Sequence, residues 1–202
     1  MSVFIEIQTN QYPLTASEIM GANRHMSFPV PFEAPDGYAP VAETAQPAHN
    51  ANTHRVVEAA PAEQGGVWAQ RWTVVALTAA EKAAALAAAK AQLLEAATAK
   101  RWAVETGGVT FPDGTRVGST TEDQNRITTV IANAQLAGVT SVDFKAASGW
   151  LTLSLAELQG IAAAIALHVQ DCFSAERDHH EAIASLTLAQ ARAYDINGGW
   201  PA

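Results

Sequence analysis

Four side chains with metal-binding or nucleophilic chemistry follow one another near the C-terminus: His168, Cys172, Glu176 and His179. Steps of four, four and three residues place them near one face of a single helix. Imidazole, thiolate and carboxylate groups are all zinc ligands, and a separation of four residues lets two neighbours reach one ion. This line is therefore the first candidate for a metal site.

The same helical face also carries large apolar residues, namely Ile161, Ile165, Ile183 and Leu186. Four polar residues spread over three helical turns cannot all reach one ion. We therefore expect no bound metal and no cofactor, with the histidines satisfied by hydrogen bonds in the core or at its rim. The cluster Asp178-His179-His180-Glu181 is most simply a solvated stretch of helix.

Cys172 is the candidate nucleophile because His168 lies four residues before it. A thiol within an apolar stripe is usually inert, since its thiolate is disfavoured there. The sequence contains no Gly-x-Ser-x-Gly elbow, phosphate loop or dinucleotide fingerprint. A glycosidase needs two apposed carboxylates, a pair that one sequence cannot reveal. We assign no catalytic, cofactor-binding or metal-ligating residue and expect a protein that is not an enzyme.

Composition argues against several classes of partner. Twelve Lys and Arg residues against twenty Asp and Glu give a net charge of -8. Nucleic-acid binding requires a cluster of basic residues that displaces phosphate counterions, and no such cluster is present. The start of the chain lacks a basic, apolar signal sequence, and no uncharged apolar run reaches the roughly 18 residues that span a bilayer. We expect a soluble protein that does not insert into membranes.

The N-terminal region predicts short elements around a proline-rich segment. Residues 3–7 alternate as a strand does, and Thr15 with Glu18 forms a capping box that opens a short helix ending near Gly21. Five prolines between Phe28 and Pro47 favour extended backbone. This segment is either an arm that docks on a partner or a long surface loop, with little core to join in the isolated chain.

Residues 54–58 and 68–77 predict a β-hairpin with a longer loop around Pro61 and Gly65-Gly66. Trp68, Trp72 and Val74 fall on one face of the second strand, and Val67, Arg71 and Val75 fall on the other. Neither face is purely polar. Such a sheet needs a second cover, from its own chain or from another one.

An alanine-rich helix follows, opened by a capping box at Thr78 and Glu81. Residues 79–99 contain twelve alanines and neither glycine nor proline, which strongly favours a helix. Leu86 and Leu93 lie one heptad apart. The helix either packs on its own module or self-associates as a short bundle. We expect a homo-oligomer, with a trimer as the favoured state.

The C-terminal region predicts a small antiparallel sheet with two helices. Strands are expected at residues 101–105, 109–111 and 115–117, and a hairpin across Ser148-Gly149. Further capping boxes, Ser119 with Glu122 and Ser154 with Glu157, open the two helices. The apolar stripe of the second helix reaches Leu186, and Asn197-Gly198-Gly199 either ends this helix or follows its end. Trp102 and Trp150 are expected to anchor the sheet from buried positions, so that Trp150→Ala costs about 3–5 kcal/mol. Trp200 is expected to be exposed or bound by a partner.

Together these elements predict an α+β protein of two small antiparallel-sheet and helix modules joined by the alanine-rich helix. Residues 1–77 form the N-terminal attachment region of strand, proline-rich arm and hairpin. Residues 78–100 form the connecting or oligomerisation helix. Residues 101–202 form the C-terminal α+β domain.

Residues 101 to about 185 resemble an uncharacterised C-terminal domain found in tail proteins of tailed bacteriophages and prophages. The matching residues are Arg101-Trp-Ala-Val-Glu-Thr-Gly-Gly108, Thr115-Arg-Val117 with Ser119-Thr-Thr-Glu122, Asp143-Phe-Lys145 to Gly149-Trp150, and His168-Val169 to Cys172-Phe173. Upstream, the run Trp68 to Thr78 followed by Glu81 is similar to a hairpin-then-helix region of tail-fibre-associated proteins. The same loose pattern is seen in tail-fibre assembly proteins.

The resemblance implies a structural virion component at the baseplate or tail fibre, which binds other tail proteins. It implies synthesis in the cytoplasm of a host bacterium and a final location in the virion tail. A tail-fibre assembly chaperone is the first alternative, and a glycan hydrolase is the second. The resemblance supplies no catalytic residues.

Overall fold

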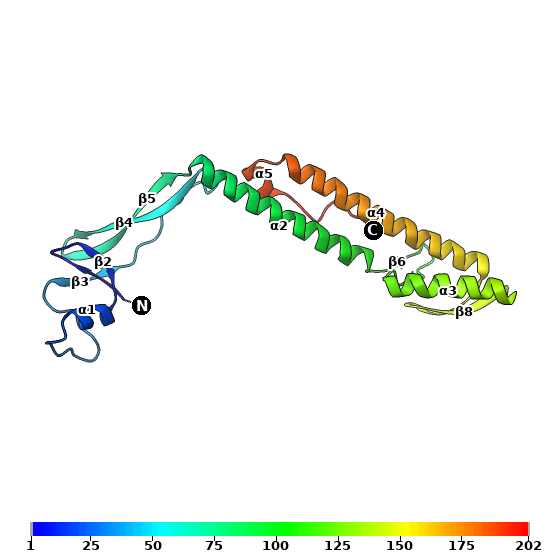
Figure 1. Cartoon of the computed structure of the whole chain (residues 1–202), viewed down its shortest axis with the longest axis horizontal. Coiled ribbons are helices and arrows are strands. Elements are labelled where there is room, and N and C mark those ends of the chain that lie inside the picture. The colour runs from blue at the N-terminus through cyan, green and yellow to red at the C-terminus, as the bar shows by residue number, and fades with distance from the viewer. Residues whose placement is uncertain (1, 202) are drawn as a thin grey trace. The chain divides into compact units, whose positions relative to one another are not determined.

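The computed structural model describes residues 2–201 and has the α+β architecture expected from the sequence (Figure 1). The chain divides into two compact units, residues 1–82 and residues 83–202. Each unit has its own sheets and its own apolar core, so each is described separately.

The first unit is a five-stranded sheet with one short helix. Its elements are β1 (Val3–Glu6), β2 (Gln11–Leu14), α1 (Ala16–Ala22), β3 (Tyr38–Ala42), β4 (His54–Gln64) and β5 (Val67–Ala76). The strand order is β2-β1-β3-β5-β4. The pairs are antiparallel except β3–β5, which are parallel and joined only at Val41–Trp68 and Ala42–Ala69. The sheet is therefore mixed, which corrects the expectation of a purely antiparallel one.

The core of the first unit is small. It consists of buried Phe4, Leu14 and Ile19, with Phe32 packed edge-on against Phe4 at 5.4 Å between ring centroids. The predicted capping box is confirmed, because the Thr15 side chain accepts from the Glu18 amide and the Glu18 carboxylate accepts from the Thr15 amide. These local bonds fix where α1 begins.

The proline-rich segment joins this core over its first half. Phe28 and Phe32 pack against each other at 5.5 Å between centroids, and residues 38–42 pair with β1 as strand β3. The expectation that the whole segment joins no core is therefore wrong for residues 28–42. Two aromatic rings supply the anchoring that a count of prolines does not reveal.

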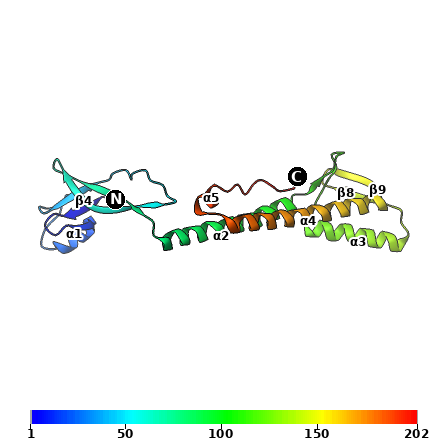
Figure 2. The ribbon, with the colours of Figure 1, turned by 90° about the horizontal axis from the view of Figure 1, so that it is seen from above.

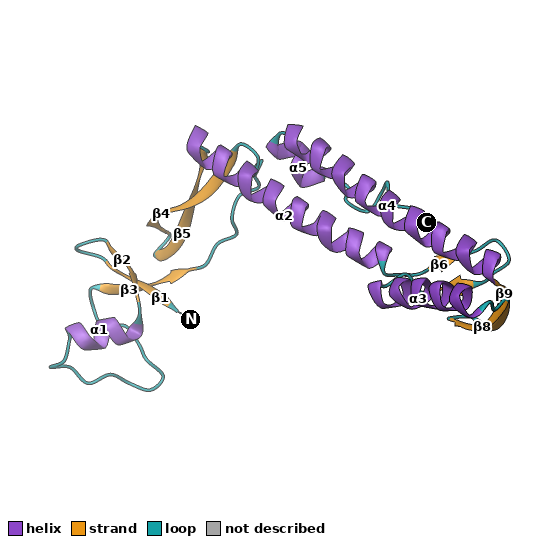
Figure 3. Cartoon of the chain, turned by 45° about the vertical axis from the view of Figure 1, so that its right-hand side comes forward, coloured by secondary structure: helices purple, strands orange, loops and turns teal. Residues whose placement is uncertain are grey.

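The hairpin of β4 and β5 is longer than predicted (Figure 3). Its turn consists of Gly65 and Gly66 alone, both at positive φ (60° and 83°), as a tight two-residue turn requires. The longer loop expected around Pro61 is wrong. Pro61 lies within β4, where the register shifts between Ala59 and Ala62, and a bulge accepts a residue that lacks an N–H group.

The alanine-rich helix α2 runs from Ala79 to Glu105. Its predicted start is confirmed, because the Glu81 amide donates to the Thr78 hydroxyl at 3.2 Å and the Thr78 amide donates back to the Glu81 carboxylate at 2.8 Å. The strand predicted at residues 101–105 is wrong, since these residues form the last turns of the helix. No glycine or proline interrupts the helix before Gly107, so it continues through Trp102 and Val104.

The second unit continues with two short hairpins and three further helices. These are β6 (Val109–Thr110), β7 (Arg116–Val117), α3 (Thr121–Ala137), β8 (Ser141–Ala146), β9 (Gly149–Ser154), α4 (Leu155–Ser185) and α5 (Leu188–Ala193). Their main core combines β7, β8, α3 and α4 through Val117, Ile127, Phe144, Ala146, Leu158, Ile161 and Ile165. The predicted hairpin across Ser148-Gly149 is confirmed.

Helix starts in this unit follow side-chain caps. The box at Ser154 and Glu157 is confirmed. The cap of α3 is Thr120 with Asp123, one residue later than predicted. Ser119 is instead fully buried, where its hydroxyl donates to the Glu105 carbonyl and accepts from the Gly108 amide at 3.0 Å. This serine ties the end of α2 to the start of α3.

The last long helix ends before Asn197-Gly198-Gly199, which is one of the two possibilities that the sequence left open. It stops at Ser185, and a fifth capping box at Thr187 and Gln190 opens the separate helix α5. The chain beyond α5 then runs back along α4 (Figure 2). There Trp200 stacks on His179 at 4.9 Å between ring centroids, so the expectation of an exposed or partner-bound Trp200 is wrong.

Two tryptophans expected in the core face solvent. Trp102 is 55% exposed on α2, and Trp150 is 72% exposed on β9. In the β8–β9 pair, Phe144 opposes Leu151 on the core side, whereas Lys145 opposes Trp150 on the outer side. Since side chains alternate along a strand, the core takes Leu151 and leaves Trp150 outside.

Candidate functional site

The predicted line of polar residues lies on α4, and two of its members, His168 and Glu176, contact α2. The two helices run side by side in opposite directions within the second unit (Figures 1 and 3). Lys90 Nζ donates to the Ala184 carbonyl at 2.7 Å, Thr98 Oγ1 donates to Glu176 Oε1 at 2.5 Å, and His168 Nε2 lies 3.2 Å from the Val104 carbonyl oxygen. These contacts define a polar seam between α2 and α4.

His168 and Cys172 do not form a catalytic pair. The Val104 carbonyl oxygen can only accept a hydrogen bond, so His168 Nε2 carries the proton in that bond. The Cys172 Sγ lies 3.8 Å from the same nitrogen, which therefore has no lone pair to receive the thiol proton. Burial raises the pKa of the Cys172 thiol, and the nearby Glu105 carboxylate raises it further. The thiol is held in its unreactive form.

We expect Cys172 to react with a thiol reagent only when the protein unfolds. The side chain is fully buried, and its raised pKa keeps the native thiolate scarce at the pH, about 8.5, where an ordinary thiol is half ionised. Labelling should be complete in urea and negligible over the same period in buffer, even at pH 9. Because the chain has one cysteine, the signal has one source. Rapid native labelling below pH 8 would reveal an activated thiolate.

His179 is a structural residue that holds the C-terminal segment. Its Nε2 lies 3.0 Å from the Gly198 carbonyl oxygen, and its Nδ1 lies 2.8 Å from the Tyr194 hydroxyl oxygen. Nε2 therefore donates to the carbonyl, and in the neutral ring the tyrosine hydroxyl donates to Nδ1. The expectation of a histidine satisfied by hydrogen bonds is confirmed for His179, whereas the solvated stretch expected over residues 178–181 is wrong at this residue. Neither nitrogen has a lone pair free for a metal. The aromatic residues Tyr194 and Trp200 were the sequence signals that could have indicated a contact with His179.

The seam also contains a buried ion cluster on Arg101. Its guanidinium contacts the Glu105 carboxylate and lies 2.7 Å from Glu176 Oε2, with all three side chains at most 14% exposed. The Phe173 ring lies against the guanidinium at 4.5 Å. Glu105 and Glu176 are thus two apposed carboxylates, but both are ion-paired to one cation. A glycosidase instead needs a protonated acid facing its substrate.

Metal and membrane sites are not found in the part of the chain that the structure describes. Among residues 2–201, no group of three or more His, Cys, Asp or Glu side chains is arranged to hold a metal ion. No helix among the same residues is both long enough and apolar enough to span a membrane.

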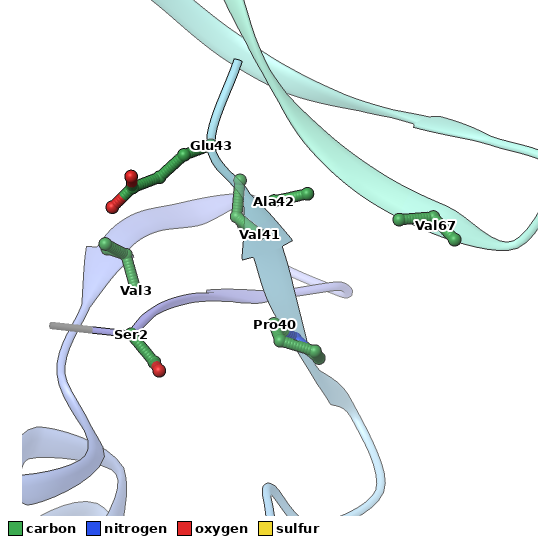
Figure 4. A pocket seen from close by; sticks show the side chains of 7 residues that line it. All are labelled: Ser2, Val3, Pro40, Val41, Ala42, Glu43 and Val67. Atoms are coloured by element: carbon green, nitrogen blue, oxygen red, sulfur yellow. The ribbon is translucent and has the colours of Figure 1, made fainter.

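A groove of about 350 Å³ lies along β3 in the first unit. Figure 4 shows its lining, which is Ser2, Val3, Pro40, Val41, Ala42, Glu43 and Val67. It opens where β5 pairs only with the end of β3, leaving Tyr38 to Pro40 without a neighbour on that side. Pro40 has no N–H group and the Tyr38 amide donates to the Pro35 carbonyl at 3.1 Å, so neither of these two residues offers a donor to a new strand. The groove therefore offers an apolar surface formed mainly by valines, and we assign it no catalytic role.

The remaining candidate is the β4–β5 hairpin, which carries apolar residues on both faces. No side chain of β5 is buried, and Pro61 is the one buried residue of β4. Val67 is 57% exposed and Val74 is 40% exposed. Large exposed apolar patches mark interaction sites. The arrangement is suited to binding a protein surface.

Residues 88–197 match the family described as a domain of unknown function, DUF4376, and this match spans more than half of the chain. The chain belongs to this family. The DUF4376 region begins inside α2 and includes the whole polar seam from Lys90 to Ala184. It excludes the β4–β5 hairpin and the groove along β3. No curated protein and no solved structure matches the chain.

Proposed function

We propose that this protein is a structural component of a tailed-phage virion, located at the baseplate or tail fibre, where it binds other tail proteins and performs no catalysis. The phage assignment comes from the resemblance carried by Arg101 to Gly108, Ser119 to Glu122 and Gly149-Trp150. The DUF4376 match itself names no function.

The observation that carries a binding role is the uncovered β4–β5 hairpin. Valines lie on both faces of the hairpin, and its two tryptophans lie on one of them. No side chain of strand β5 is buried. A protein that works within an assembly has neighbours to cover such surfaces. The polar side chains of α4, by contrast, have partners within the chain, as the pairing of Glu176 with Arg101 and the two bonds of His179 illustrate.

Quantitative mass spectrometry of purified particles tests the proposal. A structural component should be present at a fixed ratio to other tail proteins after particles are banded on a density gradient. A tail-fibre assembly chaperone, whose apolar hairpin would hold folding fibre chains, should appear in the lysate and be depleted from particles. That second result would contradict the structural role.

A matched pair of variants ties incorporation to the hairpin. Val74→Asp places a charge on the hairpin surface and should abolish incorporation into particles. Leu136→Asp changes another exposed apolar residue, 87% exposed on α3, and should leave incorporation unchanged. Equal incorporation of both variants would remove the hairpin from the docking site.

A further inference from the structure

The register of β4 and β5 sorts the hairpin side chains onto two different faces. Directly opposed residues of the two strands share a face. One face carries the pairs Val56–Val74, Glu58–Trp72 and Glu63–Trp68. The other face carries the pairs Arg55–Val75, Val57–Thr73, Ala59–Arg71 and Gln64–Val67. We call the first set the tryptophan face and the second the valine face. Both are amphipathic, and they differ in charge.

The two faces are electrostatically complementary. The tryptophan face carries the acidic residues Glu58 and Glu63, whereas the valine face carries the basic residues Arg55 and Arg71. Glu63 and Arg71 form no ion pair within residues 2–201. Charges arranged in this way favour contact between unlike faces and oppose contact between like faces.

The chain covers these faces only at isolated points. The Tyr12 hydroxyl donates to Glu58, Trp72 Nε1 donates to the Thr44 carbonyl at 3.1 Å, and Arg55 pairs with Glu81 at 2.9 Å. The cluster of Phe4, Leu14 and Ile19 contains no residue of β4 or β5, and Pro61 is the one buried residue of the two strands. One valine on each face is left exposed, Val74 at 40% on the tryptophan face and Val67 at 57% on the valine face, while Val56, Val57 and Val75 are half-buried.

The accessible surface is large enough to form an interface. The chain exposes 12,635 Å² for a mass of 21.2 kDa. Two separate compact domains of this combined mass would expose about 11,000 Å², so roughly 1,600 Å² is in excess. A standard interface buries about 1,200–2,000 Å² of accessible surface, counted over both partners. A protomer that has a neighbour on each side contributes half of two interfaces, so it buries the same total area. The excess matches that requirement.

We propose that copies of this chain assemble through the β4–β5 hairpin, with the tryptophan face of one copy packed against the valine face of the next. An interface between unlike faces is heterologous, so it does not give a two-fold dimer; it builds a closed ring of at least three copies or an open filament. The proposal goes beyond the phage assignment and holds whichever assembly the protein enters.

The hairpin replaces the alanine-rich helix as the self-association site. The Leu86 and Leu93 face of α2 is half-buried within its own chain, where Ala97 is fully buried and Lys90 bonds to α4. That face is already packed. Of the two alternatives for the alanine-rich helix, packing on its own module therefore describes α2 along this stretch, and self-association as a bundle does not.

Two variants, each disabling one face, test the proposal by light scattering on the full-length protein. The wild type should have a mass of at least three times 21.2 kDa. Val74→Asp on the tryptophan face and Val75→Asp on the valine face should each reduce the mass to that of a monomer. Mixed in equal amounts, they should form a dimer, because each retains the face that the other lacks. The exposed Leu136→Asp variant should keep the wild-type mass.

Several outcomes would overturn the proposal. These are a monomeric wild type at high micromolar concentration, aspartate variants that keep the wild-type mass, or folded variants that stay monomeric when mixed. Far-UV circular dichroism shows whether the variants are folded. If either is not, Glu63→Arg and Arg71→Glu replace them: each should weaken assembly alone, and their equimolar mixture should associate again, because the unaltered pair of faces and the charge-reversed pair are both complementary. Failure of that mixture to associate would also exclude the arrangement.

Discussion

Replacement of Arg101 by methionine should lower the free energy of unfolding by about 3–5 kcal/mol, as expected when one partner of a buried ion cluster is removed. The guanidinium lies between Glu105 and Glu176, whose side chains are 9% and 14% exposed. Methionine fills much of the volume but leaves two carboxylates buried close together without a cation. Their desolvation and mutual repulsion should destabilise the α2–α4 seam.

Urea unfolding monitored by helical circular dichroism measures this effect. Arg177→Met is the matched control, because Arg177 is 68% exposed and pairs with Asp178 and Glu181 at the surface, where such pairs contribute at most about 1 kcal/mol. Combining Arg101→Met with Glu105→Gln and Glu176→Gln should recover part of the lost stability, since the buried charges are then removed together. If Arg101→Met and Arg177→Met are equally mild, the seam is hydrated and does not hold the helices together.

The sequence predicted features whose causes are local. The boxes at Thr15, Thr78 and Ser154 are confirmed because each joins groups three residues apart. The β8–β9 hairpin is confirmed because Ser148-Gly149 and alternating residues specify it without help from distant segments. The end of the last long helix was left open because Thr187 and Gln190 were not recognised as a further box.

The polar seam was out of reach of sequence patterns for a different reason. Thr98 and Glu176 meet across 78 positions of the chain, and no local spacing links them. Arg101 to Glu105 alternate in polarity as a strand does, yet they continue an alanine-rich helix whose favourable propensity outweighs that short pattern. Likewise, His179 is buried because Tyr194 and Gly198 return to it, which only the break at Leu186 makes possible.

The charge pattern of the hairpin depends on its bulge. Glu58 and Glu63 are five positions apart, an odd spacing that places residues of a regular strand on opposite faces. The extra residue between Ala59 and Ala62 brings both carboxylates to the tryptophan face. The sequence showed that neither face of the hairpin is purely polar, but it could not show that the two faces carry opposite charges. That feature required the register.

The core of the second unit leads to the last prediction. Leu158→Ala should cost about 2–5 kcal/mol, the range for truncating a fully buried leucine. Leu158 is inaccessible to solvent and packs with Phe144, Ile127 and Ile161 between β8, α3 and α4. The first turns of α4 have little room to collapse around the lost atoms, because segments from three elements meet there.

Trp150→Ala is the informative comparison, since it removes more atoms from a neighbouring position. Trp150 is 72% exposed, and it makes a cation–π contact with Lys145, whose Nζ lies 5.7 Å from the ring centroid. An exposed cation–π contact contributes about 0.5–1 kcal/mol, so the loss should stay near or below about 1 kcal/mol. Urea unfolding of the two variants therefore separates two descriptions of the hairpin. If Trp150→Ala costs as much as Leu158→Ala, the β8–β9 register places the indole in the core, and the outward face assigned to Lys145 and Trp150 is wrong.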